Sequence, residues 1–281
     1  MKIVILNPLM CIACSLCMLQ AQAFHSPESA AYDSVSKRLF VSNYGDGTII
    51  QIDTTGEQTI FQQGLSNCLG MILSDRILYV VDSPKTILGY DICSGELRKK
   101  LTIEQAQSLN DLTRDSSGWF YVTDIRGNGI YKTDPDLRTY TCLLTTRSAA
   151  PNGILYDPLN HRLLVCFFHE KAPIHVINLK DLATTVIQTE FDNLDGLTMD
   201  LQGNVYVSYW GAGSFSAGFP TSGSIYRYDN QFAQAPVLVS TGHHGPADIY
   251  FNPATSELVI PNLLDNTIQL IPCKPEVPTN Q

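Results

Sequence analysis

The sequence predicts an all-β fold: a six-bladed β-propeller with four-stranded antiparallel blades around a central channel. Three observations predict it. A strand-like apolar pattern recurs six times along the 281 residues, its period is close to constant, and no sustained helical periodicity competes with it. Residues 24–281 form the predicted propeller domain, and these 258 residues give 43 residues per blade. A pair of β-sandwiches is the alternative architecture, but sandwiches lack so regular a repeat.

The first recurring element is a short run of Val, Ile, Leu and aromatic residues, which strands favour. It occurs at 39–44, 77–82, 119–124, 163–168, 205–210 and 257–262. A second run follows each one, usually after a turn with Gly, Pro, Asn or Asp, at 48–53, 86–91, 129–134, 173–178, 224–229 and 267–272. Each pair of runs therefore predicts a β-hairpin.

A third element precedes each hairpin and ends in an acid or amide before a turn. These markers are Asp33, Asp75, Asp115, Asp157, Asp200 and Asn252, at intervals of 42, 40, 42, 43 and 52 residues. The last interval is long because residues 211–223 are inserted into the fifth unit. A fourth, more polar strand follows most hairpins, as at 139–144 and 235–240. In the sixth unit we expect either three strands or a strand borrowed from the N-terminus, and residues 103–109 give at most one or two helical turns.

The first 23 residues have the pattern of a secretory signal peptide. Lys2 is followed by a dense apolar stretch at 9–19 and by the small-x-small motif at 21–23. The stretch is shorter than the roughly 20 residues that a membrane span needs. We expect a secreted or periplasmic protein with no stable membrane span after cleavage, and an uncleaved anchor is the alternative.

Charge and cysteine content exclude some classes of function. The formal net charge is −9 with no basic run, which argues against a nucleic-acid partner. Five cysteines lie beyond the predicted signal peptide, widely spaced and without a CxxC pair, so a zinc–thiolate site is not predicted. Export permits disulfides, but the sequence does not assign a pairing. These five are Cys68, Cys93, Cys142, Cys166 and Cys273.

In a propeller the start of each blade's first strand faces the central channel, so equivalent positions from six repeats converge. Counting back five residues from each marker gives Glu28, Gly70, Asn110, Asn152, Asp195 and Ala247. Four of the six carry a side-chain oxygen, with no thiolate or imidazole. Such a set favours Ca²⁺, with Mg²⁺, Mn²⁺ and Zn²⁺ as alternatives. The other interpretation is that these side chains cap strands at the channel mouth.

These residues lie in motifs that resemble the gluconolactonase/regucalcin-like (senescence-marker-protein) family of calcium-dependent propellers. The similar segments are PESAAYD (27–33), SLNDLTRD (108–115), APNGILYDP (150–158) and NLDGLTMDLQGNVYVSYW (193–210). The resemblance implies metal ligands at Glu28, Asn152 and Asp195. It also implies a substrate contact at Asn110 and the activity of a calcium-dependent lactonase or esterase acting on a small-molecule lactone or ester.

Two departures from the family pattern bear on the substrate. The first motif reads Glu28-Ser29-Ala30 where the family usually has Glu-Gly-Pro. Ser108 and Leu109 precede Asn110 where sugar-lactone members often place an arginine, which argues against a polyhydroxylated aldonolactone. The sixth unit, 244–262, resembles a less characterised bacterial branch.

The resemblance implies ester hydrolysis in which a cation polarises the lactone carbonyl. Asp195 is then the candidate to ligate the cation and to orient or deprotonate the attacking water. His244, just before the sixth inner strand, is a candidate substrate contact, while His25 and His243 are further candidate bases or ordinary loop histidines. Asp111 is either a support for the ligands or a hydrogen-bond acceptor between blades.

Asp248 has the same two interpretations as Asp111. Tyr209, Trp210 and Phe215 form either an apolar lid or a cover for a blade edge. No serine-hydrolase elbow or HExxH motif is present. A non-catalytic propeller that binds a ligand or protein, with a structural metal, is the alternative function. An isomerising or condensing enzyme of the strictosidine-synthase-like kind shares the scaffold.

Overall fold

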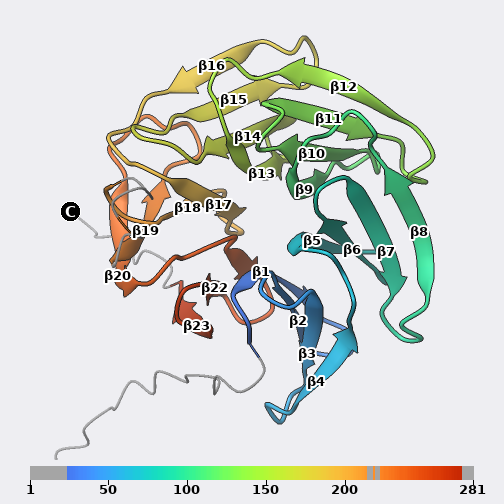
Figure 1. The fold of residues 1–281 in the computed structure, drawn as a ribbon. Coiled ribbons are helices and arrows are strands. Elements are labelled where there is room, and N and C mark those ends of the chain that lie inside the picture. Colours follow the sequence, from blue (N-terminus) through green and yellow to red (C-terminus); the bar gives the residue numbers. More distant parts are fainter. Residues whose placement is uncertain (1–23, 214–217, 219–221, 274–281) are drawn as a thin grey trace, which may run out of the picture.

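The structure, a computed structural model, describes residues 24–213, 218 and 222–273. Within these ranges it contains 23 strands in six antiparallel sheets and no helix. Figure 1 shows the sheets arranged as blades around a central axis, with β1, β5, β9, β13 and β17 next to the axis. The six-bladed propeller predicted from the repeat is confirmed. The predicted signal peptide, residues 1–23, lies outside the described residues.

The first three blades have four strands each, in chain order from the axis to the rim. Blade 1 comprises β1 (Pro27–Asp33), β2 (Arg38–Asn43), β3 (Thr48–Ile52) and β4 (Gln58–Gln62). Blade 2 comprises β5 (Cys68–Ser74), β6 (Ile77–Asp82), β7 (Thr86–Asp91) and β8 (Leu97–Thr102). Blade 3 comprises β9 (Leu109–Arg114), β10 (Phe120–Asp124), β11 (Gly129–Thr133) and β12 (Tyr140–Thr145).

The remaining blades follow the same order, and blade 6 has three strands in the described part of the chain. Blade 4 comprises β13 (Pro151–Asp157), β14 (Arg162–Phe167), β15 (Ile174–Asn178) and β16 (Thr184–Ile187). Blade 5 comprises β17 (Leu194–Met199), β18 (Val205–Tyr209), β19 (Gly223–Tyr228) and β20 (Val237–His243). Blade 6 comprises β21 (Tyr250–Asn252), β22 (Glu257–Asn262) and β23 (Thr267–Pro272).

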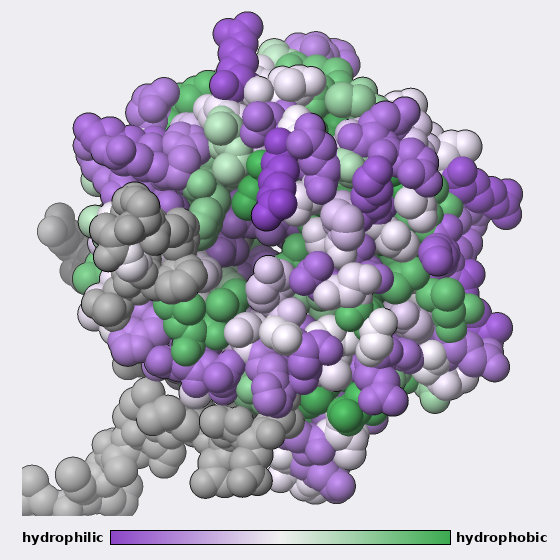
Figure 2. Space-filling model, viewed as in Figure 1, coloured by the Kyte–Doolittle hydropathy of each residue, from purple (hydrophilic) through white to green (hydrophobic). Residues whose placement is uncertain are grey.

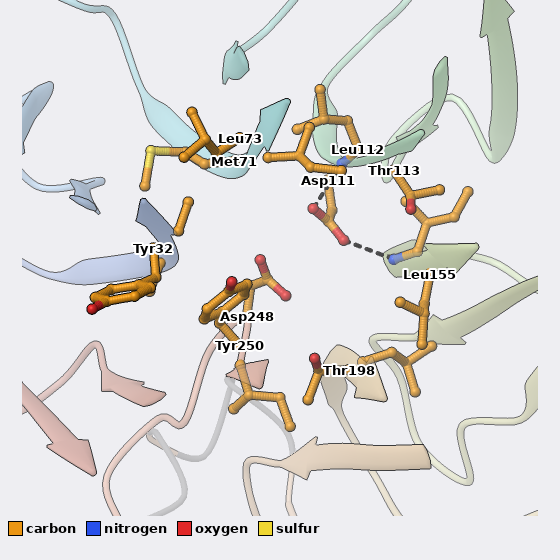
Figure 3. Close-up of a pocket in the computed structure, with 16 residues that line it drawn as sticks. Tyr32, Met71, Leu73, Asp111, Leu112, Thr113, Leu155, Thr198, Asp248 and Tyr250 are labelled. Atoms are coloured by element: carbon orange, nitrogen blue, oxygen red, sulfur yellow. Dashed lines mark hydrogen bonds between the residues drawn. The ribbon is translucent and has the colours of Figure 1, made fainter. Parts of the chain in front are cut away.

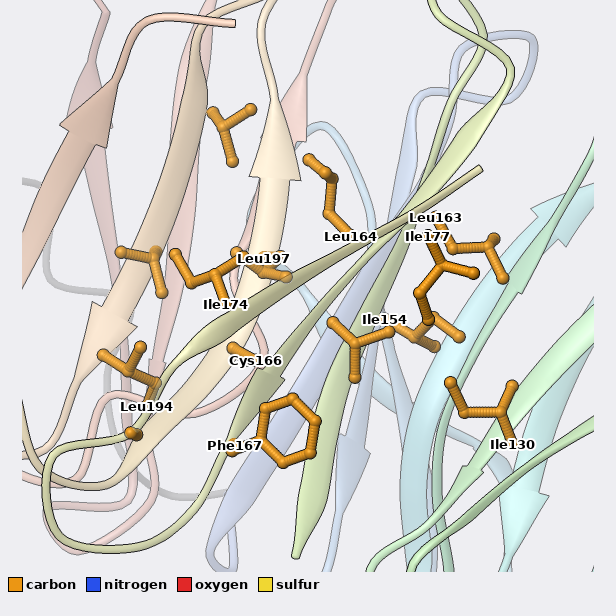
Figure 4. Packing of buried hydrophobic residues seen from close by; sticks show 14 of the residues in the cluster. Ile130, Ile154, Leu163, Leu164, Cys166, Phe167, Ile174, Ile177, Leu194 and Leu197 are labelled. Carbon is orange, nitrogen blue, oxygen red and sulfur yellow. The ribbon is translucent and has the colours of Figure 1, made fainter. Parts of the chain in front are cut away.

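The apolar core lies between the faces of adjacent blades. The second strand of each blade is buried on both faces, which is why it reads as a nearly continuous apolar run. Figure 4 shows one such cluster, where Leu163, Cys166 and Phe167 of β14 pack with Ile130 of blade 3 and Leu197 of blade 5. Burial of each such side chain contributes roughly 1.5–3 kcal/mol.

The marker acids end the inner strands by accepting hydrogen bonds from the turns that follow. Asp33, for example, accepts from the backbone N–H groups of Val35 and Ser36, both at 3.1 Å. Such Asx turns are a common role of aspartate. In blade 2 the strand ends at Ser74, and Asp75 lies in the turn with a positive φ of 51°.

The sequence allows at most one or two helical turns at 103–109; the structure has none there, and residues 103–108 form an irregular connection that leads into β9 at Leu109. Its apolar residues Ile103, Ala106 and Leu109 are buried in the cluster that also contains Leu101 of blade 2 and Phe120 of blade 3. Burial between two blades thus explains the three-residue spacing of these apolar side chains.

Candidate functional site

Each inner strand begins with a bulge, at which the inner strand has one residue more than the second strand opposite it. In blade 1, Glu28 and Ser29 face Ser42 of β2, and the register shifts in the same place in blades 2 to 5. In blade 6 the bulge lies between the Pro246–Asn262 bridge and β21. A bulge twists the strand locally and re-aims its side chains.

The first residue of each bulge occupies what we call the channel position. The six channel positions are Glu28, Leu69, Asn110, Asn152, Asp195 and Ala247. The register corrects one sequence-based assignment. Counting back from Asp75 gives Gly70, but the two bulge residues of blade 2 that face Val81 are Leu69 and Gly70, so Leu69 is the equivalent of Glu28.

The four oxygen-bearing channel residues share an unusual feature. Within the described structure, one side-chain oxygen of each is buried and has no hydrogen-bond partner, namely Glu28 Oε2, Asn110 Oδ1, Asn152 Oδ1 and Asp195 Oδ1. Glu28, Asn152 and Asp195 are only 4%, 3% and 6% exposed. Leaving a buried polar atom unpaired costs about 1–3 kcal/mol. Four such oxygens at equivalent positions form a set that a bound ligand would satisfy.

Burial and neighbouring charges both raise the pKa values of the two channel carboxylates, Glu28 and Asp195. Burial raises the pKa of Glu28 well above its usual range, and the charges of Asp195, Asp248 and Asp111 raise it further. Burial and the charge of Asp248 raise the pKa of Asp195 to about 8, while hydrogen bonding by the side chains of Trp210 and Asn152 acts in the opposite direction. A cation among these groups would relieve their mutual repulsion.

The polar residues at the second position of the bulges link neighbouring blades. Asp111 accepts hydrogen bonds from the N–H groups of Leu112 and Ile154, the latter in blade 4, both at 2.7 Å. Asp248 accepts from the hydroxyl of Ser29 in blade 1 at 2.6 Å. These bonds support the interpretation of Asp111 and Asp248 as blade-linking acceptors.

The glycines at this second bulge position allow close approach of the blades. A Cβ on Gly196 would lie 2.5 Å from the Cα of Asp248, and one on Gly153 would lie 2.4 Å from the carbonyl oxygen of Asp195. A side chain there would push the next blade away. The close contact between the backbones of neighbouring blades therefore requires glycine at positions 153 and 196.

A cavity of about 170 Å³ lies in the channel beside the second bulge residues (Figure 3). Figure 3 shows the carboxylates of Asp111 and Asp248 pointing into it, with Tyr32 and Tyr250 along its wall. Burial raises the pKa of Asp248 to about 7. Glu28, Asn152 and Asp195 do not line this cavity, so it is separate from the channel positions.

The channel positions suit a hard cation, because all their ligating atoms are carboxylate or amide oxygens. Two carboxylates, Glu28 and Asp195, would balance one divalent charge, and Asn152 would add a neutral oxygen, while Asn110 would be left to contact substrate. Among the described residues, no three His, Cys, Asp or Glu side chains are grouped as metal ligands. Any cation held here therefore depends on the amide of Asn152 as well as on the two carboxylates.

The predicted substrate residues lie in different surroundings. Asn110 shares the channel position with the candidate ligands, whereas His244 is half exposed and pairs with Asp265, its Nδ1 lying 2.9 Å from Oδ1. His243 is buried, with Nε2 2.9 Å from the hydroxyl of Ser240. No contact in the described structure joins His244 to the channel residues, so its role stays a prediction.

The aromatic residues of blade 5 divide into two groups. Trp210 is buried, stacks edge-on against Phe168 at 5.3 Å and interacts with Asp195. Tyr209 instead packs against Phe191 and covers the blade. Phe215, the third predicted lid residue, lies outside the described residues. Figure 2 shows mixed polar and apolar side chains around an opening near the centre of the visible face.

The five described cysteines are all free thiols, with Cys68 and Cys166 buried. Within the described residues there is no helix that could span a membrane.

The fold and the oxygen-lined channel define a class of six-bladed propellers with a polar centre, and comparison with known proteins specifies the family. The profile described as the SMP-30/Gluconolactonase/LRE-like region matches residues 26–251. The chain belongs to this family, which confirms the resemblance seen in its motifs.

Individual relatives are more distant. Lactonase drp35 of Staphylococcus epidermidis is 30% identical over 120 residues, covering 37% of this chain and 36% of the relative. Lactonase drp35 of Staphylococcus haemolyticus is 28% identical over 199 residues, covering 62% and 61%. The matches therefore span less than two thirds of either relative.

Solved structures show similarity of fold. A gluconolactonase from Xanthomonas campestris superposes with a TM-score of 0.70 at 16% identity, covering 91% of this chain and 88% of that one. A chain of a nidogen–laminin complex gives a TM-score of 0.64 at 14% identity, covering 83% and 92%. At these identities the comparison establishes the propeller alone.

Proposed function

We propose that this protein is a secreted hydrolase that opens a lactone or a related carboxylic ester and depends on a divalent cation, Ca²⁺ first, held by Glu28, Asn152 and Asp195. The observation that carries the proposal is the set of buried, unpaired oxygens at the channel positions. Membership of the family and the drp35 lactonases support the reaction type.

Each channel residue has a distinct role in the proposed reaction. When bound, the cation supplies Lewis acidity toward the ester carbonyl. Asp195 orients the attacking water and accepts its proton. Asn110, one blade from Asn152, donates a hydrogen bond to a substrate oxygen.

The surroundings of the channel favour a substrate of low polarity. Two of the six channel positions are apolar, Leu69 and Ala247, and the side chain of Trp210 lies beside Asp195. Ser108 and Leu109 stand before Asn110, where an arginine would recognise sugar hydroxyls. We therefore propose lactones or esters with apolar substituents ahead of polyhydroxylated aldonolactones.

The decisive experiment is a panel of lactones and esters assayed on metal-stripped protein, with Ca²⁺, Mg²⁺, Mn²⁺ and Zn²⁺ restored separately. Restored hydrolysis of at least one lactone, with Ca²⁺ most effective, is the expected result. Hydrolysis that is unaffected by chelation would contradict the cation requirement. Tight Ca²⁺ binding without hydrolysis of any member would favour the alternative, a non-catalytic binding propeller.

A further inference from the structure

The residue of the second strand that faces each bulge forms a second series around the channel. Its members, which we call bulge-facing residues, are Ser42, Val81, Thr123, Cys166, Ser208 and Pro261. All are buried, yet three are hydroxyl residues and one is a thiol. Buried hydroxyls between apolar blades need hydrogen-bond partners, and their partners show what this series does.

The hydroxyls of Thr123 and Ser208 each accept a hydrogen bond within their own blade. Because the bulge interrupts the ladder, the second bulge residue has an N–H without a strand partner. Thr123 Oγ1 accepts this bond from the N–H of Asp111 at 3.1 Å. Ser208 Oγ accepts the equivalent bond from Gly196 at 2.7 Å.

The same two hydroxyls, and the thiol of Cys166, also donate a hydrogen bond to the backbone carbonyl of the channel residue in the next blade. The three bonds run from Thr123 Oγ1 to the carbonyl of Asn152 (2.6 Å), from Cys166 Sγ to that of Asp195 (2.9 Å), and from Ser208 Oγ to that of Ala247 (2.8 Å). Thr123, Cys166 and Ser208 therefore each tie their own blade to the channel residue of the following blade.

We propose that Thr123 and Cys166 are positioning residues for the candidate cation ligands, with Thr123 fixing Asn152 and Cys166 fixing Asp195 from the preceding blade. The inference rests on the proposed function, since it assigns these two residues to the cation site. A bond to the carbonyl fixes the peptide plane beside the ligand and thereby the direction of its Cα–Cβ bond. Partners that orient a ligand typically change metal affinity by 10- to 100-fold.

The third candidate ligand, Glu28, is held by a different donor. At the junction of blades 6 and 1 the bulge-facing residue is Pro261, which has no donor. There the N–H of Asp248 donates to the carbonyl of Glu28 at 2.9 Å. All three candidate ligands thus have their carbonyls bonded to the preceding blade.

The chain itself supplies the right substitution for a test. Val81 is the bulge-facing residue of blade 2, so the fold accommodates a valine at this position. Thr123→Val removes the hydroxyl while keeping a branched side chain of nearly the same size. We expect it to weaken Ca²⁺ binding about 10-fold or more, measured by isothermal titration calorimetry on metal-stripped protein.

Two further variants separate positioning from general loosening of the ring. Thr123→Ser keeps the donor and should bind Ca²⁺ within about 3-fold of wild type, on the same scale. Thr113→Val removes a bond across the same junction of blades 3 and 4, because Thr113 Oγ1 accepts from the N–H of Tyr156 at 3.0 Å, and neither residue is at a channel position. It should lower the melting temperature while leaving the Ca²⁺ dissociation constant within about 2-fold of wild type.

The Cys166 pair repeats the test at the second ligand. Cys166→Ser keeps a donor toward Asp195, and Cys166→Ala removes it. We expect the alanine variant to bind Ca²⁺ about 10-fold more weakly and the serine variant to stay close to wild type.

The outcomes distinguish this inference from the proposed function. Folded Thr123→Val that binds Ca²⁺ as wild type does would overturn the inference and leave the proposed function standing. Equal weakening by Thr113→Val would also overturn it, because the effect would then not follow the ligands. Wild-type protein that binds none of the four cations would overturn both.

Discussion

Cation removal should lower the stability of this protein, because the channel gathers four buried carboxylates. Glu28, Asp111, Asp195 and Asp248 all have raised pKa values; burial is the largest cause, and the charges of the neighbouring carboxylates add to it for the first three. Without a cation the folded state must protonate these groups or bear their repulsion. A divalent cation that binds only the folded state offsets this cost.

The magnitude follows from the size of the domain and the binding equilibrium. At a free Ca²⁺ concentration of 100 times Kd, the free energy of unfolding rises by about 2.7 kcal/mol. For a domain of this size, 1 kcal/mol changes the melting temperature by roughly 2–4 °C. We therefore expect Ca²⁺ to raise the melting temperature by roughly 5–11 °C.

The assay is thermal unfolding followed by circular dichroism at pH 7.5, with chelator and with Ca²⁺. Glu28→Gln is the matched variant, because it keeps the size and one oxygen but removes a buried charge. It should lose most of the Ca²⁺-dependent increase, yet melt no lower than wild type in chelator. A full Ca²⁺ response in Glu28→Gln would refute the reasoning, as would an unchanged melting temperature for wild type shown to contain metal beforehand.

Three further substitutions have defined outcomes. Asp195→Asn should reduce turnover of the best substrate by about 100-fold or more at saturating Ca²⁺ while the protein stays folded; equal turnover would exclude Asp195 as the base. Burial acts to raise the pKa of Asp157, but hydrogen bonds, including one from Arg162, hold that pKa below its usual value. The ion pair therefore stabilises the fold at any pH above the usual pKa of an aspartate. This contribution is lost as the pH falls through the lower pKa of the folded state. Arg162→Met should therefore cost about 3 kcal/mol in urea unfolding at pH 7 and less at acid pH; a cost independent of pH would contradict this. Gly196→Ala should cost about 1–3 kcal/mol because its Cβ would meet backbone of blade 6, whereas Gly129→Ala, whose Cβ has nothing closer than 3.9 Å, should be tolerated; equal costs would refute the close-approach argument.

The repeat made the blades predictable, because each strand carries its own local pattern. Runs such as 77–82 and 257–262 coincide with β6 and β22. The marker acids were equally informative, since an Asx turn needs a particular residue at a particular place. Where the marker moved one residue into the turn, at Asp75, the same count gave Gly70 in place of Leu69.

The arrangement of the site was only partly visible in the sequence. Glu28, Asn110, Asn152 and Asp195 could be singled out because their motifs share a phase, and the family resemblance distinguished the three candidate ligands from Asn110. The bulge that re-aims them, and the bonds that Thr123 and Cys166 make across blades, depend on register and on the neighbouring blade. A serine, threonine or cysteine in an apolar strand was the one available signal, and these small residues also occur in buried strands that hold no ligand.

The central claim is that a cation is held by Glu28, Asn152 and Asp195, and an anomalous-scattering experiment tests it most directly. Crystals of metal-stripped protein would be soaked in Tb³⁺ as a Ca²⁺ substitute and then back-soaked in Ca²⁺. The account predicts one peak in the channel within about 2.3–2.6 Å of Glu28 Oε2, Asn152 Oδ1 and Asp195 Oδ1, displaced by Ca²⁺. A channel without a peak at saturating Tb³⁺, or a peak only beside Asp111 and Asp248, would contradict it.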